Sequence, residues 1–288
     1  MVWKRNPSRG SPWFPAQGRS MKRRELITLL VCAVAVWPLN GLLTALALAS
    51  PAFAQTPSDD GASIAAEAKD AATQLQEYLD GVLKGGGRPD FSKPPASDLL
   101  GQVFNLQQLE ALPPAQGGDL PWLIDWVVAA NGVYKSIVSF GIAPPVTPLT
   151  DEAALQRNFT DYEDQLATAS NFLLRILARE IPAAFAFMDQ LPPARRTPVR
   201  MEGLNKMRVS YAGMVGSYLG CIVPGIKPAN ARLISAAIRD TGAVMATAIL
   251  PVDRPTILAM LDKAQAAVKD EETHSNLSAL GNLMAKAK

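Results

Sequence analysis

Histidine and cysteine are scarce in this 288-residue chain, which has one histidine, His274, and two cysteines, Cys32 and Cys221. A zinc site needs several such ligands in convergent geometry, and a single histidine excludes motifs built on paired histidines. A serine or cysteine nucleophile would have to use His274 as its base. We therefore expect no metal and no cofactor, and we interpret His274, which lies in a charged stretch near the C-terminus, as a solvated residue.

Phosphate-binding loops, strand patterns and a second membrane span are also missing. Gly85-Gly86-Gly87-Arg88 follows a helical pattern, whereas a phosphate-binding loop follows a strand and opens a helix. We interpret it as a helix end and a flexible link. The apolar stretch 120–142 contains Asp125, Asn131 and Lys135, and a charge near a membrane helix centre costs about 2.5–3.5 kcal/mol, so a buried helix is expected there.

A long apolar run near the start is what the sequence does have. Met21-Lys22-Arg23-Arg24 is basic, Leu26 to Ala49 is almost entirely apolar, and Ala52-Phe53-Ala54 is a small-x-small cleavage pattern. We predict that residues 1–54 are an upstream extension and an export leader, and that the protein works in the bacterial periplasm. The apolar run is long enough to cross a bilayer, so an inner-membrane anchor through an uncleaved leader is the alternative.

Charge changes sign when the leader is removed. The full chain has 28 basic and 26 acidic residues; residues 1–54 hold seven basic and one acidic, which leaves 21 and 25, a net charge of −4, on residues 55–288. No electrostatic case for nucleic-acid binding remains.

Only Cys221 remains after cleavage at Ala54, so no internal disulfide can form. The surrounding residues, Leu219 to Val223, are mostly apolar, which is typical of a buried, unreactive thiol. The core alone must therefore hold the domain together.

Helical signals account for nearly all of the remaining chain. Ser58 or Asp59, Asp119, Thr150 and Thr197 are placed to cap helices. Apolar spacing and the positions of glycine and proline predict helices over residues 58–83, 98–103, 106–112, 119–140, 151–181, 197–223, 228–250, 253–268 and 274–284. Pro182 should kink or end the fifth of these helices, with residues 183–191 continuing beyond the bend.

The fifth helix carries the strongest pattern. Its apolar residues repeat at alternating spacings of four and three, and the repeat reaches a charged residue, Arg179 or Glu180, at its end: Leu155, Phe159, Tyr162, Leu166, Ala169, Leu173 and Ile176. This heptad-like stripe predicts packing along another helix at a shallow angle. We predict an all-α, bundle-like fold of about six or seven helices, with an N-terminal helix and Gly/Pro-rich link over 55–95 and a bundle domain over 96–288.

Several segments are candidate sites, each with a simpler interpretation. Small residues recur in the segment 211–220, at Gly213, Gly216, Ser217 and Gly220, which favours close helix packing; a ligand groove lined by Tyr211, Met214 and Tyr218 is the alternative. The other candidates are an anion or headgroup site at Arg195, Arg196 and Arg200, acid–base chemistry at Asp151, Glu152, Asp161, Glu163 and Asp164, and a buried polar group at Asp125. Ordinary surface charge is the simpler explanation of the basic and acidic groups. For Asp125, the simpler explanation is a small, polar helix face that is exposed or lies at an interface.

No catalytic constellation emerges, and neither catalytic nor ligand-binding residues can be assigned. The leading hypothesis is an exported helical binding or interaction protein of the bacterial envelope, whose partner is an unknown protein. The alternative is a periplasmic carrier of an apolar small molecule or lipid in a groove between helices.

Overall fold

The computed structural model describes residues 59–143 and 151–287, and all regular structure within these ranges is helical. The all-α prediction is thus confirmed. The predicted leader, Ser58 and Thr150 lie outside the described residues. Within the described ranges, no helix combines the length and the apolar character needed to cross a membrane.

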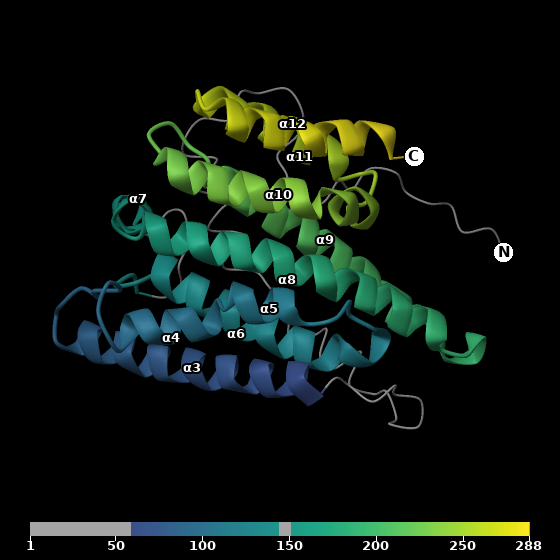
Figure 1. The fold of residues 1–288 in the computed structure, drawn as a ribbon, viewed down its shortest axis with the longest axis horizontal. Helices are drawn as coiled ribbons and strands as arrows, with labels where there is room; N and C mark the ends of the chain where they lie inside the picture. Colours follow the sequence, from purple (N-terminus) through teal and green to yellow (C-terminus); the bar gives the residue numbers. More distant parts are fainter. Residues whose placement is uncertain (1–58, 144–150, 288) are drawn as a thin grey trace.

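Five long helices form a stack in which each packs along the next (Figure 1). They are α3 (Asp59–Lys84), α6 (Leu120–Val138), α8 (Glu163–Gln190), α10 (Pro228–Ala248) and α12 (Glu271–Lys286). Two further helices, α9 (Pro198–Gly220) and α11 (Arg254–Ala267), contact each other; α9 also packs on α8 and α10, and α11 on α12. These seven helices form most of the bundle in the described chain, and the shorter helices bring the number above the six or seven predicted.

Short helices complete the connections. They are α4 (Ala96–Val103), α5 (Leu106–Ala111), the 3-10 turn η2 (Gly117–Asp119), α7 (Glu152–Asp161) and the 3-10 turn η3 (Pro193–Arg195). Both α4 and α5 agree with the short helices predicted there to within two residues.

One apolar core runs through the stack, with aromatic side chains near its centre. Trp126 of α6 lies 5.2 Å from Phe172 of α8, and its indole N–H donates to the carbonyl oxygen of Val103 at 2.9 Å. Leu75 and Leu79 of α3 are buried in the same core. Because α3 shares this core with α6, burial of its apolar face stabilises the N-terminal layer. The division into units 55–95 and 96–288 stays a prediction.

Helix ends follow the predicted signals in several places. After α3, Gly86 has φ +70° and the amide of Gly87 bonds to the carbonyl of Val82, the geometry that glycine adopts most easily. The Thr197 hydroxyl accepts from the amide of Arg200 at the start of α9. Asp253 precedes α11, but its carboxylate makes no capping bond.

The prediction that Asp119 caps α6 with its side chain is wrong. One carboxylate oxygen accepts from the indole N–H of Trp122 at 3.0 Å, and the other accepts from the amide of Gln116 at 2.8 Å. The carboxylate therefore closes the turn η2 that precedes the helix, because Asp119 already has helical backbone angles.

The prediction of a single helix over 151–181 is also wrong, because the chain bends at Tyr162 between α7 and α8. Tyr162 has φ −114° and ψ 26°, and its ring packs edge-on against Phe91 at 5.2 Å with Arg88 over its face. The stripe residues stay buried on both sides of the bend, apart from half-buried Phe159. At the other end, α8 continues through Pro182 to Gln190.

Asn158 of α7 ties this bend to the rest of the molecule. Its amide donates to the carbonyl oxygens of Val138 and Phe140 at 3.0 and 2.9 Å, and its side-chain oxygen accepts from Arg88 at 3.1 Å. Arg88 also pairs with Asp161 at 2.9 Å. The segment after α3, interpreted from sequence as a flexible link, is thus held against α7.

Arginine side chains satisfy carbonyl groups at several helix ends. Arg208 donates to the carbonyl of Ala248 at 2.7 Å at the end of α10, and Arg179 donates to Leu112 and Pro113 beyond α5. Arg254 donates to the carbonyls of Ala246 and Ala287. The last carbonyls of a helix have no partner within it and carry partial negative charge, so these bonds supply both a donor and a favourable charge.

Candidate ligand sites at the end of helix α9

Two hollows flank the connection between α9 and α10. After Gly220 the chain turns through Pro224 and Gly225, where Gly225 has φ +93°, and enters α10 at Pro228. One hollow lies between this connection and the α7–α8 bend, and the other lies between it and α11. Gly220, Val223 and Pro224 line both, so they form a shared wall.

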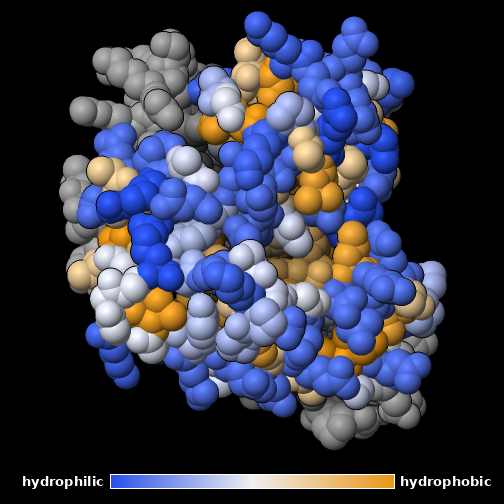
Figure 2. Space-filling view, turned by 60° about the vertical axis from the view of Figure 1, so that its left-hand side comes forward, coloured by the Kyte–Doolittle hydropathy of each residue, from blue (hydrophilic) through white to orange (hydrophobic). Residues whose placement is uncertain are grey.

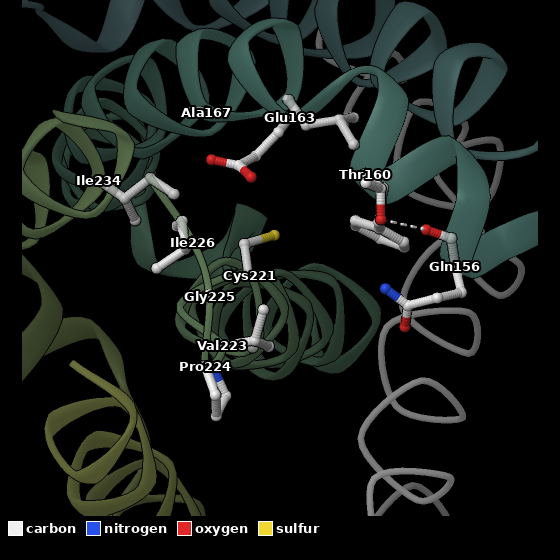
Figure 3. Close-up of a pocket in the computed structure, with 13 residues that line it drawn as sticks. Gln156, Thr160, Glu163, Ala167, Cys221, Val223, Pro224, Gly225, Ile226 and Ile234 are labelled. Atoms are coloured by element: carbon white, nitrogen blue, oxygen red, sulfur yellow. Dashed lines mark hydrogen bonds between the residues drawn. The ribbon is translucent and has the colours of Figure 1, made fainter. Parts of the chain in front are cut away.

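The first hollow, here called the acid-lined cavity, has a volume of about 170 Å³. Its lining comes from four helices and the connection: Gln156, Phe159, Thr160, Glu163, Leu166, Ala167, Gly220, Cys221, Val223, Pro224, Gly225, Ile226 and Ile234. The carboxylate of Glu163 and the sulfur of Cys221 point into it, with Thr160 and Gln156 on the α7 side (Figure 3).

Glu163 is already engaged with the N-terminus of α10. One carboxylate oxygen accepts from the backbone amide of Lys227 at 2.9 Å and from the side-chain amide of Asn230 at 2.7 Å. Asp164 accepts from the Lys227 ammonium at 2.7 Å and from Asn230, and these bonds lower the pKa of its carboxyl. Two acidic side chains at the positive end of a helix dipole are electrostatically favourable. These groups therefore join α8 to α10, rather than forming the purely solvated face expected from sequence.

Cys221 lies immediately after α9 with its sulfur 3.6 Å from both the hydroxyl of Tyr134 and the carbonyl oxygen of Ser217. Burial raises the pKa of the thiol to about 11. The thiolate is the nucleophilic form, so this group is a poor nucleophile at neutral pH. The raised pKa agrees with the predicted unreactive thiol, but Cys221 is only partly buried, because it lines the acid-lined cavity.

The second hollow, here called the aliphatic groove, is larger, at about 410 Å³. It is lined by Leu219, Gly220, Ile222, Val223, Pro224, Met260, Lys263, Ala264, Ala266 and Ala267. All of these side chains except Lys263 are apolar. Its volume lies in the range of about 300–1,000 Å³ typical of small-molecule sites.

The surface on this side of the molecule is mixed. Figure 2 turns forward the end where α7 and the start of α10 lie; polar residues dominate it, and apolar residues come to the surface in separate places around a central hollow.

The glycine-rich part of α9 leads to these hollows without lining them with the predicted residues. Tyr211, Met214 and Tyr218 are buried in the core, and neither hollow includes them. A Cβ at Gly216 would lie 3.0 Å from the sulfur of Met260 on α11, whereas a Cβ at Gly213 would meet no atom within 4 Å. Close packing, the leading interpretation, therefore holds at Gly216 and not at Gly213.

The arginine side chains of the predicted basic patch form hydrogen bonds to nearby backbone carbonyls. Arg196 donates to the carbonyls of Leu191 and Asp189 at the end of α8, and Arg200 donates to the carbonyl of Arg195 at 2.8 Å. These bonds close the turn between α8 and α9, and they give Arg196 and Arg200 structural roles.

The remaining predicted groups are dispersed. Asp151 caps α7 by accepting from the amide of Ala154 at 2.8 Å. Asp125 is half-exposed and lies 3.7 Å from Lys69 of α3, so it is not a buried polar group. His274 is partly buried, and its Nε2 lies 2.9 Å from the carbonyl oxygen of Val268, where it joins α11 to α12.

Two features of the structure were missed from sequence. Glu180 of α8 is 3% exposed and forms no hydrogen bond or ion pair with the described residues, and burial raises the pKa of its carboxyl to about 8. Its place in the apolar stripe was the available signal. Lys263 resembles any other surface lysine in the sequence, and only the fold brings it to the aliphatic groove.

No group of three or more histidine, cysteine, aspartate or glutamate residues within 59–143 and 151–287 is arranged to hold a metal ion. Comparison with known proteins gives no assignment. No protein-family model, no curated protein and no solved structure matches the chain significantly.

Proposed function

We propose that this protein is an exported binding protein that carries an apolar small molecule or a lipid chain in the aliphatic groove. The observation that carries the proposal is the groove itself: about 410 Å³ between α9 and α11, with nine of its ten lining residues apolar. Pockets that bind small molecules are concave and mostly apolar, with few polar groups.

A module that binds another protein is the second candidate, and the surface supports it less. Such a module would present a contiguous apolar patch larger than the few hundred Å² common on monomers. The large apolar side chains exposed in the described chain come from α3, α9, the α10–α11 turn and α12: Leu83, Val199, Met201, Val252 and Leu283.

Export forms part of the proposal and rests on the leader pattern at residues 21–54. Native mass spectrometry of the protein recovered from the periplasm tests export and binding together. We expect a chain that begins at Gln55 and retains a small apolar molecule, released by organic extraction.

A blocked groove provides the matched test of binding. Ala267 lines the groove, whereas Ala259 is exposed on the same helix and lies outside it. We expect Ala267→Phe to abolish retention of the ligand and Ala259→Phe to preserve it. Equal retention by the two variants would refute the groove as the binding site.

A further inference from the structure

Lys263 is one of several lysines in the described part of the chain that have no acidic partner, and it borders the aliphatic groove. It is partly buried on α11, yet it forms no ion pair or hydrogen bond with any described residue. Lys69, Lys206 and Lys227, by comparison, each lie within 4 Å of an acidic oxygen.

No acidic side chain lines the groove, so the ammonium group of Lys263 is the single formal charge in its lining. Eight of the other nine lining residues have side chains of aliphatic carbon or a thioether, which suit a hydrocarbon chain, and the ninth is Gly220. A site of this kind matches one class of ligand in particular, a molecule with an apolar tail and one negatively charged head.

The C-terminal ends of two helices, by contrast, disfavour an anion in the groove. The groove lies where α9 ends at Gly220 and where α11 ends at Ala267, and the carbonyl end of a helix carries a partial negative charge of roughly half an elementary charge. That charge is spread over several carbonyl groups and weakens within one turn, whereas the ammonium is a full charge on a mobile stem that can move toward a bound head group.

We propose that the aliphatic groove binds an anionic amphiphile, with the hydrocarbon tail against α9 and α11 and a carboxylate or phosphate head on Lys263. This inference rests on the proposed function and adds the chemistry of the ligand. A free fatty acid and an anionic lipid share that chemistry.

A series of head groups on a constant tail tests the inference. The protein purified after export is titrated calorimetrically with dodecanoate, dodecyl phosphate, dodecanol and dodecylammonium, below the concentrations at which each forms micelles. We expect both anions to bind about tenfold more tightly than dodecanol, and dodecylammonium to bind most weakly. The two anions distinguish a preference for a carboxylate from one for a phosphate.

Charge variants assign the effect to Lys263. Lys263→Met should weaken dodecanoate binding about five- to tenfold and leave dodecanol within twofold, while Lys263→Arg should retain the preference for the anion. Lys269, an exposed residue after α11 that lies outside the groove, provides the control: Lys269→Met removes the same charge and should change neither affinity.

The outcomes separate the inference from the proposed function. Equal affinity for dodecanol and dodecanoate in the wild type, or tighter binding of dodecylammonium, would overturn the inference while leaving the carrier function intact. Failure of every dodecyl compound to bind, or binding that Ala267→Phe does not weaken, would overturn both.

Discussion

Asn158 shows how a single buried side chain can hold three segments together. It is 1% exposed, donates to the carbonyls of Val138 at the end of α6 and of Phe140 just after it, and accepts from Arg88. Such a residue stabilises the fold mainly because its removal would leave buried polar groups without partners.

We expect Asn158→Ala to lower the free energy of unfolding by about 2–4 kcal/mol, since two carbonyls and Arg88 would lose hydrogen bonds. Urea denaturation measures this change. Thr160→Val, which removes an exposed hydroxyl on the same helix, should change stability by less than about 0.5 kcal/mol. Similar costs for the two variants would contradict this role.

Glu180 should make stability depend on pH. Burial raises its pKa from 4.5 to about 8 in the folded chain. The folded state therefore keeps a proton that the unfolded state releases between these values, so its contribution to stability is greatest below pH 4.5, falls as pH rises through this window, and is lost above about pH 8.

The Glu180→Gln variant isolates this contribution. From pH 5 to pH 8 we expect the wild type to lose roughly 3–4 kcal/mol of stability relative to Glu180→Gln, at about 1.4 kcal/mol for each unit of pKa shift. Chemical denaturation of both proteins across this pH range provides the measurement. Parallel stability curves would show that Glu180 is not buried as a neutral acid.

At the scale of elements, α9 offers two glycines in contrasting surroundings. Alanine is favoured over glycine in a helix interior by about 1 kcal/mol. Gly213 has open space at its Cβ position, whereas a Cβ at Gly216 would press on the side chain of Met260 at 3.0 Å.

We therefore expect Gly213→Ala to raise the free energy of unfolding by about 0.5–1 kcal/mol. The free energy of unfolding of Gly216→Ala should be about 1 kcal/mol lower than that of Gly213→Ala, because the Met260 side chain or α11 must give way by a few tenths of an ångström. Thermal and urea unfolding of the pair test this. An equal gain from both substitutions would show that α9 and α11 do not approach closely at Gly216.

Sequence reasoning identified most helices because their ends carry local signals. Gly86, Thr197 and Pro228 each mark a boundary through their own backbone or side-chain chemistry. The bend at Tyr162 has no such signal, since it depends on Phe91 and Arg88, which lie some seventy residues earlier in the chain.

The hollows were beyond prediction for the same reason. The groove joins the end of α9 to α11, and nothing within either segment shows that the two meet. The small residues of the segment 211–220 directed attention to α9, but Tyr211, Met214 and Tyr218, the groove lining considered there, are buried in the core.

At the scale of the whole molecule, the helices of the stack from α3 to α12 pack along one another. The hollows occur beside the α9–α10 connection, where α7, α8 and α10 approach it from one side and α11 from the other.

Export is a property of the whole chain, and it makes a direct prediction. When the full sequence is expressed in a bacterium, we expect the protein to reach the periplasm and to begin at Gln55, because Ala52 and Ala54 provide the small side chains of the cleavage pattern. N-terminal sequencing of fractionated cells measures this. Ala52→Leu combined with Ala54→Leu should leave the leader attached, and an intact wild-type chain dissolved in the cytosol would refute export.

The enclosure of Asn158 has a practical consequence for making this protein. Asn158-Phe159-Thr160 and Asn276-Leu277-Ser278 both match the acceptor pattern for N-linked glycans, yet Asn158 and Asn276 are only 1% and 3% exposed. A eukaryotic secretion host that modified these asparagines during translation would attach a bulky sugar to side chains that the folded protein must enclose. Production should therefore use a host without this modification, or a chain in which Thr160 and Ser278 are replaced.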